Sequence, residues 1–110
     1  MDFGGKPALN EAVDRLWARF LPHLKERVAI LETAAAAFAA GNLTIEQHQA
    51  AIDAAHKLAG VLGTFGLSGG TALARELEMM YSHEGGPDPA HAARLNEIAA
   101  ELRGLVENRK

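Results

Sequence analysis

The sequence predicts an all-α protein, an antiparallel four-helix bundle with a short extra N-terminal helix. Three observations support this fold class: apolar residues recur at helical spacing, alanine is abundant while aromatic residues are few, and short turns separate the periodic segments. Short connections between amphipathic helices make neighbouring helices antiparallel. The chain has 110 residues, which is enough for one compact domain with a modest core.

The N-terminal part predicts a flexible arm followed by two helices. Residues 1–8 are expected to form the arm, and residues 9–110 a single helical domain. Apolar residues at helical spacing predict a short first helix from about Leu9 to Phe20. A second helix is expected to begin near Pro22, because the missing N–H of proline costs little in the first turn. It should end at Gly41, where glycine readily adopts positive φ.

Three further helices complete the predicted bundle. Thr44 and Gln47 have the spacing of a capping box, which starts a helix that extends to about residue 65. Another helix covers roughly residues 68–81, and Asp88 is placed to cap the last one. On a helical wheel, the helix that begins at Thr44 turns one apolar arc towards the core. That arc contains Ile45, Ala51, Ile52, Ala55, Leu58, Ala59, Leu62 and Phe65.

Composition and charge exclude several classes of function. There is no cysteine, which excludes disulfides, thiolate metal sites and cysteine nucleophiles. The formal net charge is −3 and no basic patch stands out, so nucleic acid and anionic membrane are not expected as partners. No histidine pair has metal-ligand spacing, so no metal site is expected. Without a long apolar run or a signal-peptide pattern, we expect a cytoplasmic protein, and a monomer.

His56 is the residue best placed for chemistry. On the wheel it lies just outside the apolar arc, beside Gln49 and Asp53. Gly60 and Gly63 follow it along the same side of the helix. Each glycine inside a helix costs about 1 kcal/mol relative to alanine. The missing Cβ atoms would leave a shallow strip beside the imidazole, which a bulky partner could approach.

An exposed imidazole on a rigid helix suits phosphoryl transfer. Free imidazole titrates near neutral pH, so its neutral form offers a nucleophilic nitrogen. No phosphate-binding loop or nucleotide site is recognisable, so no kinase activity of its own is expected. A plainer interpretation also exists, because a histidine beside an apolar face is usually a surface residue without a role. The glycines could reflect close helix packing, and Asp53 with His56 could form a metal pair or simply a solvated face.

Residues 55–78 resemble the signature of histidine-containing phosphotransfer (HPt) domains. The stretch Gly63-Thr64-Phe65-Gly66 is especially similar to the phosphotransfer domain of chemotaxis-type histidine kinases. Several other positions follow the family pattern: His56, Leu58, Gly60, Leu73, Ala74, Leu77 and Glu78. The resemblance implies a four-helix bundle in which His56 carries the phosphoryl group. We expect support from Lys57, Gly60 and Gly63, and receiver contacts from Gln49, Asp53 and Thr64.

The implied function is that of a phosphorelay carrier. His56 would accept a phosphoryl group from the phospho-aspartate of a receiver domain, or from a histidine kinase, and pass it to a response-regulator receiver. The expected partners are therefore receiver domains and a hybrid histidine kinase. No cofactor is expected on this chain, because the receiver would supply the magnesium ion and the acidic pocket.

Two positions depart from the family pattern. The family usually has a lysine three residues after the histidine, where this chain has Ala59, and the nearest lysine is Lys57. Gly70 stands where the family usually has leucine, which should loosen the start of the helix over residues 68–81. Two alternatives therefore stay open: a degenerate HPt-like bundle that binds a receiver or kinase without being phosphorylated, and a plain structural helical module that forms a dimer.

Overall fold

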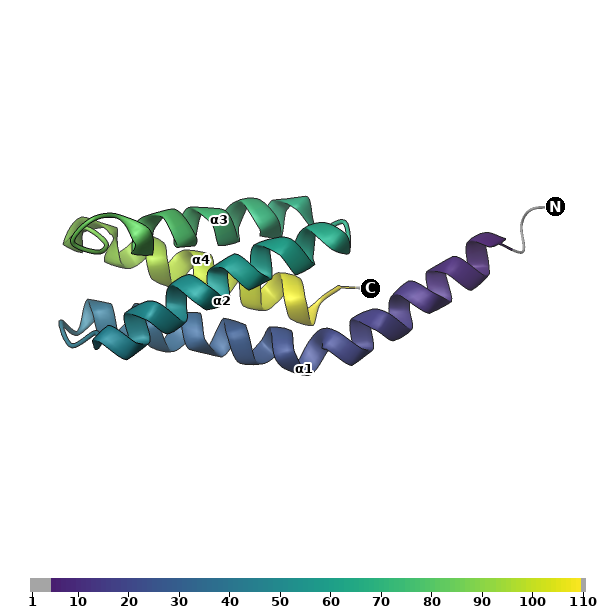
Figure 1. Cartoon of the computed structure of the whole chain (residues 1–110), viewed down its shortest axis with the longest axis horizontal. Helices are drawn as coiled ribbons and strands as arrows, with labels where there is room; N and C mark the ends of the chain where they lie inside the picture. Colours follow the sequence, from purple (N-terminus) through teal and green to yellow (C-terminus); the bar gives the residue numbers. More distant parts are fainter. Residues whose placement is uncertain (1–4, 110) are drawn as a thin grey trace.

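The computed structural model describes the backbone of residues 5–109 and the side chains of residues 11–109. Its helices are α1 (Gly5–Ala39), α2 (Ile45–Thr64), α3 (Ser68–Ser82), the 3₁₀ turn η1 (Pro89–His91) and α4 (Ala92–Glu107). The C-terminal half of α1 lies beside α2 and α4, α3 packs against α2 and α4 on the far side, and the chain reverses direction between successive α-helices (Figure 1). No strand occurs within residues 5–109, so the predicted all-α four-helix bundle is confirmed.

The prediction of a separate short N-terminal helix is wrong, because α1 is continuous through Pro22. A proline inside a helix removes one hydrogen bond and costs about 3 kcal/mol. Pro22 is exposed, whereas Trp17 and Leu24 on either side of it are 6% and 0% exposed. Burial of two such side chains contributes about 1.5–3 kcal/mol each, which offsets the cost of the proline. α1 bends as it leaves the bundle (Figure 1), as expected for a helix that contains proline.

The boundary of the expected N-terminal arm also differs from the prediction. α1 begins at Gly5, so residues 5–8 belong to the helix rather than to an arm. Residues 1–4 lie outside the described part of the chain.

The predicted caps are present. The backbone N–H of Gln47 donates to Oγ1 of Thr44 at 3.0 Å, and the N–H of Thr44 donates to Oε1 of Gln47 at 2.9 Å. These two bonds satisfy backbone donors that the start of α2 would otherwise leave free. Oδ1 of Asp88 accepts from the N–H of Ala90 at 2.8 Å, so Asp88 caps the 3₁₀ turn that precedes α4.

The core runs along the axis of the bundle. Leu24 of α1, Leu58 of α2, Leu77 of α3 and Leu102 of α4 are each at most 1% exposed. The prediction that Ile45 faces the core is wrong, because its side chain is 79% exposed. Ile45 is the first residue of α2, at the end of the bundle, and a periodic pattern cannot tell where the neighbouring helices stop.

A tight turn between α2 and α3 sets the geometry of the site. Gly66 has φ +77°, which glycine adopts without strain, and the N–H of Leu67 donates to the carbonyl of Leu62 at 2.8 Å. The turn brings α3 back along α2, so residues at similar distances before and after Leu67 lie at similar heights along the two helices. None of the helices within residues 5–109 is both long and apolar enough to cross a membrane.

Candidate functional site

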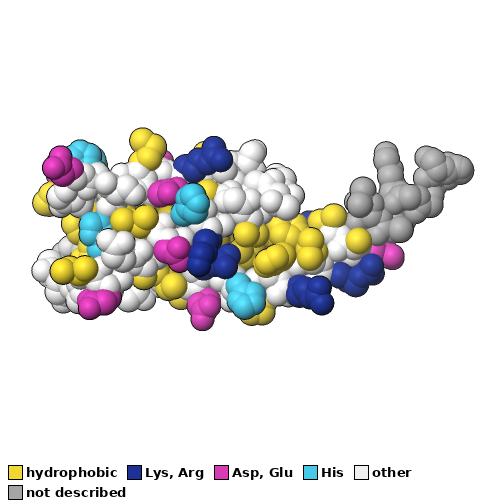
Figure 2. All heavy atoms as spheres, viewed as in Figure 1, with side chains coloured by type: hydrophobic (Ala, Val, Ile, Leu, Met, Phe, Trp, Pro, Cys, Tyr) yellow, Lys and Arg dark blue, Asp and Glu magenta, His cyan; other side chains and the backbone are white. Residues whose placement is uncertain are grey.

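His56 projects from the middle of α2 into solvent. Its neighbours Ala55 and Leu58 are fully buried and fix the rotation of the helix, while the side chain of His56 is 72% exposed. This agrees with the position of His56 on the predicted helical wheel. In Figure 2, histidine, acidic and basic side chains gather over the middle of the bundle, on the face where α2 and α3 are seen together.

Glu78 of α3 holds the imidazole of His56. Nδ1 of His56 lies 2.9 Å from Oε2 of Glu78, whose side chain is 30% exposed. An ionised carboxylate only accepts hydrogen bonds, so Nδ1 carries the proton and donates. In the neutral ring, Nε2 is therefore the unprotonated nitrogen, with its lone pair available to a reagent in solution.

Glu78 was expected only as a position of the family pattern, and its contact with His56 was not predicted from the sequence. The two residues lie 22 positions apart, beyond the reach of any helical periodicity. The position of the turn could have predicted this contact, because His56 lies eleven residues before Leu67 and Glu78 lies eleven residues after it. Antiparallel helices joined by a short turn bring such mirrored positions together.

The two glycines that follow His56 have different surroundings. A Cβ placed on Gly60 would meet no atom within 4 Å, so this position is an open part of the surface. A Cβ on Gly63 would lie 3.2 Å from Oγ1 of Thr71 in α3. The hydroxyl of Thr71 also donates to the carbonyl of Ala59 at 2.9 Å. Gly60 therefore fits the predicted open strip, whereas Gly63 also permits the close approach of α2 and α3.

The remaining predicted site residues lie on the exposed side of α2. Nζ of Lys57 is 3.0 Å from Oδ2 of Asp53, and both side chains are more than half exposed. Gln49 and Thr64 are also exposed, and the hydroxyl of Thr64 donates to the carbonyl of Gly60 at 3.1 Å. All of the predicted site residues thus lie on α2, and His56 is near the middle of the segment that they span, residues 49–64.

Ala59, where the family pattern has lysine, is only 5% exposed, and its backbone carbonyl accepts the hydrogen bond from Thr71 of α3. A longer side chain at this position would have to emerge past its packed neighbours. Among the residues whose side chains are described, no three histidine, aspartate or glutamate side chains converge as a metal site would require.

Ion pairs join α4 to α3 and to α1. Arg94 of α4 binds Glu76 of α3 through two bonds of 2.8 and 2.9 Å, and these hydrogen bonds lower the pKa of Glu76. Arg103 of α4 also forms a bidentate pair with Glu32 of α1, and these hydrogen bonds lower the pKa of the Glu32 carboxyl. Paired geometry of this kind restricts how the helices slide past each other.

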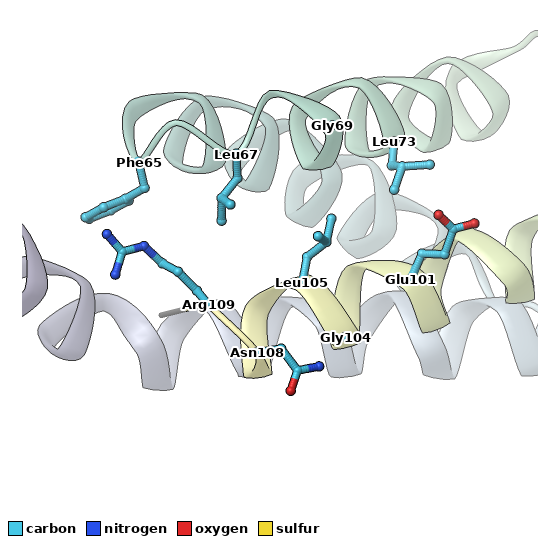
Figure 3. A pocket seen from close by; sticks show the side chains of 9 residues that line it. All are labelled: Phe65, Leu67, Gly69, Leu73, Glu101, Gly104, Leu105, Asn108 and Arg109. Atoms are coloured by element: carbon cyan, nitrogen blue, oxygen red, sulfur yellow. The ribbon is translucent and has the colours of Figure 1, made fainter.

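A groove separate from His56 lies between α3 and α4, near the C-terminal end of α4 (Figure 3). It is lined mainly by apolar side chains, including Leu67, Leu73 and Leu105. Arg109 points towards Phe65, and its Cζ lies 5.6 Å from the centre of that ring, a cation–π contact. No histidine, cysteine, serine or threonine lines this groove, so its lining offers no nucleophile comparable to His56.

Comparison with known proteins gives two matches. The family model described as the Hpt domain matches residues 15–108. Protein RcaC of Microchaete diplosiphon is 31% identical over 100 residues, which are 91% of this chain and 15% of that protein. The chain thus spans 15% of the length of this relative. No solved structure matches the chain significantly.

Proposed function

The chain belongs to the Hpt domain family, and we therefore propose that Nε2 of His56 is the phosphoryl acceptor of a phosphorelay. Membership gives the chain a phosphotransfer role in two-component signalling, alongside receiver and kinase components. The finer proposal is that a receiver phospho-aspartate, or a histidine kinase, donates to His56, and that a response-regulator receiver then accepts the group.

The observation that carries this proposal is the exposed imidazole whose Nδ1 is bound to Glu78. Nε2 would form a bond to phosphorus while the bond between phosphorus and the aspartyl oxygen breaks. The carboxylate of the receiver would leave, and the proton would stay on Nδ1 in its hydrogen bond to Glu78. Positive charge that develops on the ring would then lie beside a carboxylate. Onward transfer would reverse these steps on a second receiver.

The exposed side of α2 is the proposed docking surface for the receiver. It comprises Gln49, Asp53, His56, Lys57, Gly60, Gly63 and Thr64. The receiver would bring the magnesium ion and the acidic pocket that phosphoryl transfer from aspartate needs, so this chain has to offer only a nucleophile and a complementary surface. The open space at Gly60 would let that surface approach the imidazole closely.

Transfer of labelled phosphate from a phosphorylated receiver tests the proposal. Wild type should acquire an acid-labile label, as expected of a phosphoramidate, and His56→Gln should acquire none. His23→Gln is the matched control, because His23 is an exposed histidine on α1 far along the chain from the site. A label on the His56→Gln variant, or none on wild type with any phosphorylated receiver, would contradict the proposal.

Gly60→Leu tests the docking surface separately. Leucine is the better helix former and would meet no neighbouring atom at its Cβ, so the fold should persist. The bulk beside His56 should nevertheless slow transfer and weaken receiver binding, measured by calorimetry. Unchanged binding and transfer would show that a receiver does not approach over Gly60.

Ala59 favours a second candidate function, binding of a receiver or kinase without phosphorylation. The family's usual lysine would offset the charge of the phosphoryl group, and this chain lacks it. The second function would be correct if the receiver binds wild type without transfer, and if only Ala59→Lys becomes labelled.

A further inference from the structure

A phosphoryl group on His56 would need positive charge beside it. A phosphorylated side chain carries between one and two negative charges at neutral pH. It would arrive next to Glu78, whose Oε2 is 2.9 Å from Nδ1 of the same ring. Lys57 follows His56 directly, but its ammonium is paired with Asp53 at 3.0 Å. These neighbours of His56 therefore offer little cationic charge that is not already matched by a carboxylate.

Arg75 lies on α3 between the two residues that contact α2 around the site. It follows Thr71, which donates to the carbonyl of Ala59, by four positions, and it precedes Glu78 by three. Residues three and four apart are neighbours on a helix surface, with Cβ atoms about 5–6 Å apart. The placement of Thr71 and Glu78 thus puts Arg75 at the α2–α3 seam, one helical turn from the residue that holds the imidazole.

Arg75 also differs from the other arginines that follow α1 in having no carboxylate partner. Four arginines lie between residues 45 and 109. Arg94 pairs with Glu76, Arg103 with Glu32, and Arg109 with Asp14. Arg75 is exposed and takes part in none of the ion pairs found among residues 11–109.

We propose that Arg75 binds the phosphoryl group on His56, so that α3 supplies the cation that α2 lacks at Ala59. This rests on the proposed function and identifies a phosphoryl-binding residue outside α2. The planar guanidinium presents several N–H donors in a geometry that suits phosphate oxygens. Ala59 has only a methyl group and is 5% exposed, so α2 contributes no cation at this position. Arg75 would contact the phosphoryl oxygens while Glu78 keeps its bond to Nδ1.

Four proteins test this proposal: wild type, Arg75→Gln, Arg75→Lys and the control Arg19→Gln. Arg19 is also exposed and free of ion pairs among residues 11–109, but it lies on α1. At saturating phosphorylated receiver, Arg75→Gln should transfer about tenfold more slowly, the effect expected of one positive charge about 6 Å from a doubly charged group in a water-like medium. Arg75→Lys should keep part of the rate, and Arg19→Gln all of it.

A second measurement does not depend on the receiver. His56 can be phosphorylated chemically with phosphoramidate, and the phosphoryl group titrated by ³¹P NMR. A cation in contact favours the doubly charged form, so the phosphoryl pKa should lie lower in wild type and Arg19→Gln than in Arg75→Gln. A role of Arg75 in folding or docking alone would not move this pKa.

The outcomes separate the two proposals. If wild type takes no phosphate from any phosphorylated receiver, the proposed function fails and the role of Arg75 falls with it. If wild type is labelled but Arg75→Gln matches its rate and its phosphoryl pKa, only the inference about Arg75 is overturned. Arg75→Gln could instead keep the maximal rate and raise only the receiver concentration that gives half of that rate. This result would also overturn the inference, because it would make Arg75 a docking residue.

Discussion

Glu78→Ala is the perturbation that most directly tests the geometry at His56. The substitution removes a 2.9 Å hydrogen bond between a carboxylate and an imidazole that becomes cationic during transfer. Hydrogen bonds to charged groups contribute about 1.5–3 kcal/mol. Because the two side chains are 30% and 72% exposed, water replaces part of the bond. We therefore take about 1 kcal/mol, which corresponds to roughly a fivefold slower transfer.

Glu78→Gln separates the two contributions of the carboxylate. The amide oxygen can still accept from Nδ1 and hold the ring, but the negative charge is lost. We expect a rate between those of wild type and Glu78→Ala. Glu84→Ala is the control, because Glu84 is an exposed acidic residue just beyond α3.

Single-turnover transfer from a phosphorylated receiver at saturating concentration measures these rates, and ¹⁵N NMR of the imidazole reports which nitrogen carries the proton. Wild type and Glu78→Gln should have the proton predominantly on Nδ1, while Glu78→Ala should have a mixture. If Glu78→Ala transfers as fast as wild type and keeps the same tautomer, the reasoning from the 2.9 Å contact is refuted.

Two further predictions concern stability, measured by urea denaturation. Gly70→Ala should lower the free energy of unfolding by about 1 kcal/mol, because its Cβ would lie 2.9 Å from Cδ1 of the fully buried Leu62. The Cβ of the control Gly69→Ala would meet no atom within 4 Å, so this variant should raise the free energy of unfolding by about 0.5 kcal/mol. Equal effects of the two substitutions would refute the packing argument. Arg103→Gln should cost about 0.5–1 kcal/mol at pH 7, since its partner Glu32 is 40% exposed. The hydrogen bonds from Arg103 lower the pKa of Glu32 in the folded state below 4.5. The stabilisation by this ion pair is therefore present above pH 4.5 and is lost as the pH falls through the folded-state pKa. A stability difference between wild type and Arg103→Gln that persists at about pH 2 would contradict this prediction.

Local signals in the sequence determined most of the helical framework. The capping box of Thr44 and Gln47 and the glycine at position 66 fix the ends of α2 to within about one residue, because caps act over three or four positions of the same chain segment. The apolar period of α2 also placed His56 on the exposed side, since rotation about the axis of a regular helix follows from residue spacing. Fold class and the candidate nucleophile could therefore be predicted without coordinates.

The continuity of α1 and the contacts between helices depend on tertiary packing, which local sequence signals do not contain. α1 passes through Pro22 because Trp17 and Leu24 are buried on both sides of it, and no local rule contains that packing energy. Glu78 reaches His56 because the turn before α3 sets the register and rotation of one helix against another. Such contacts join residues far apart in sequence, and their geometry depends on how whole helices pack against each other. Helical periodicity predicts which side of one helix is buried but not how two helices pack.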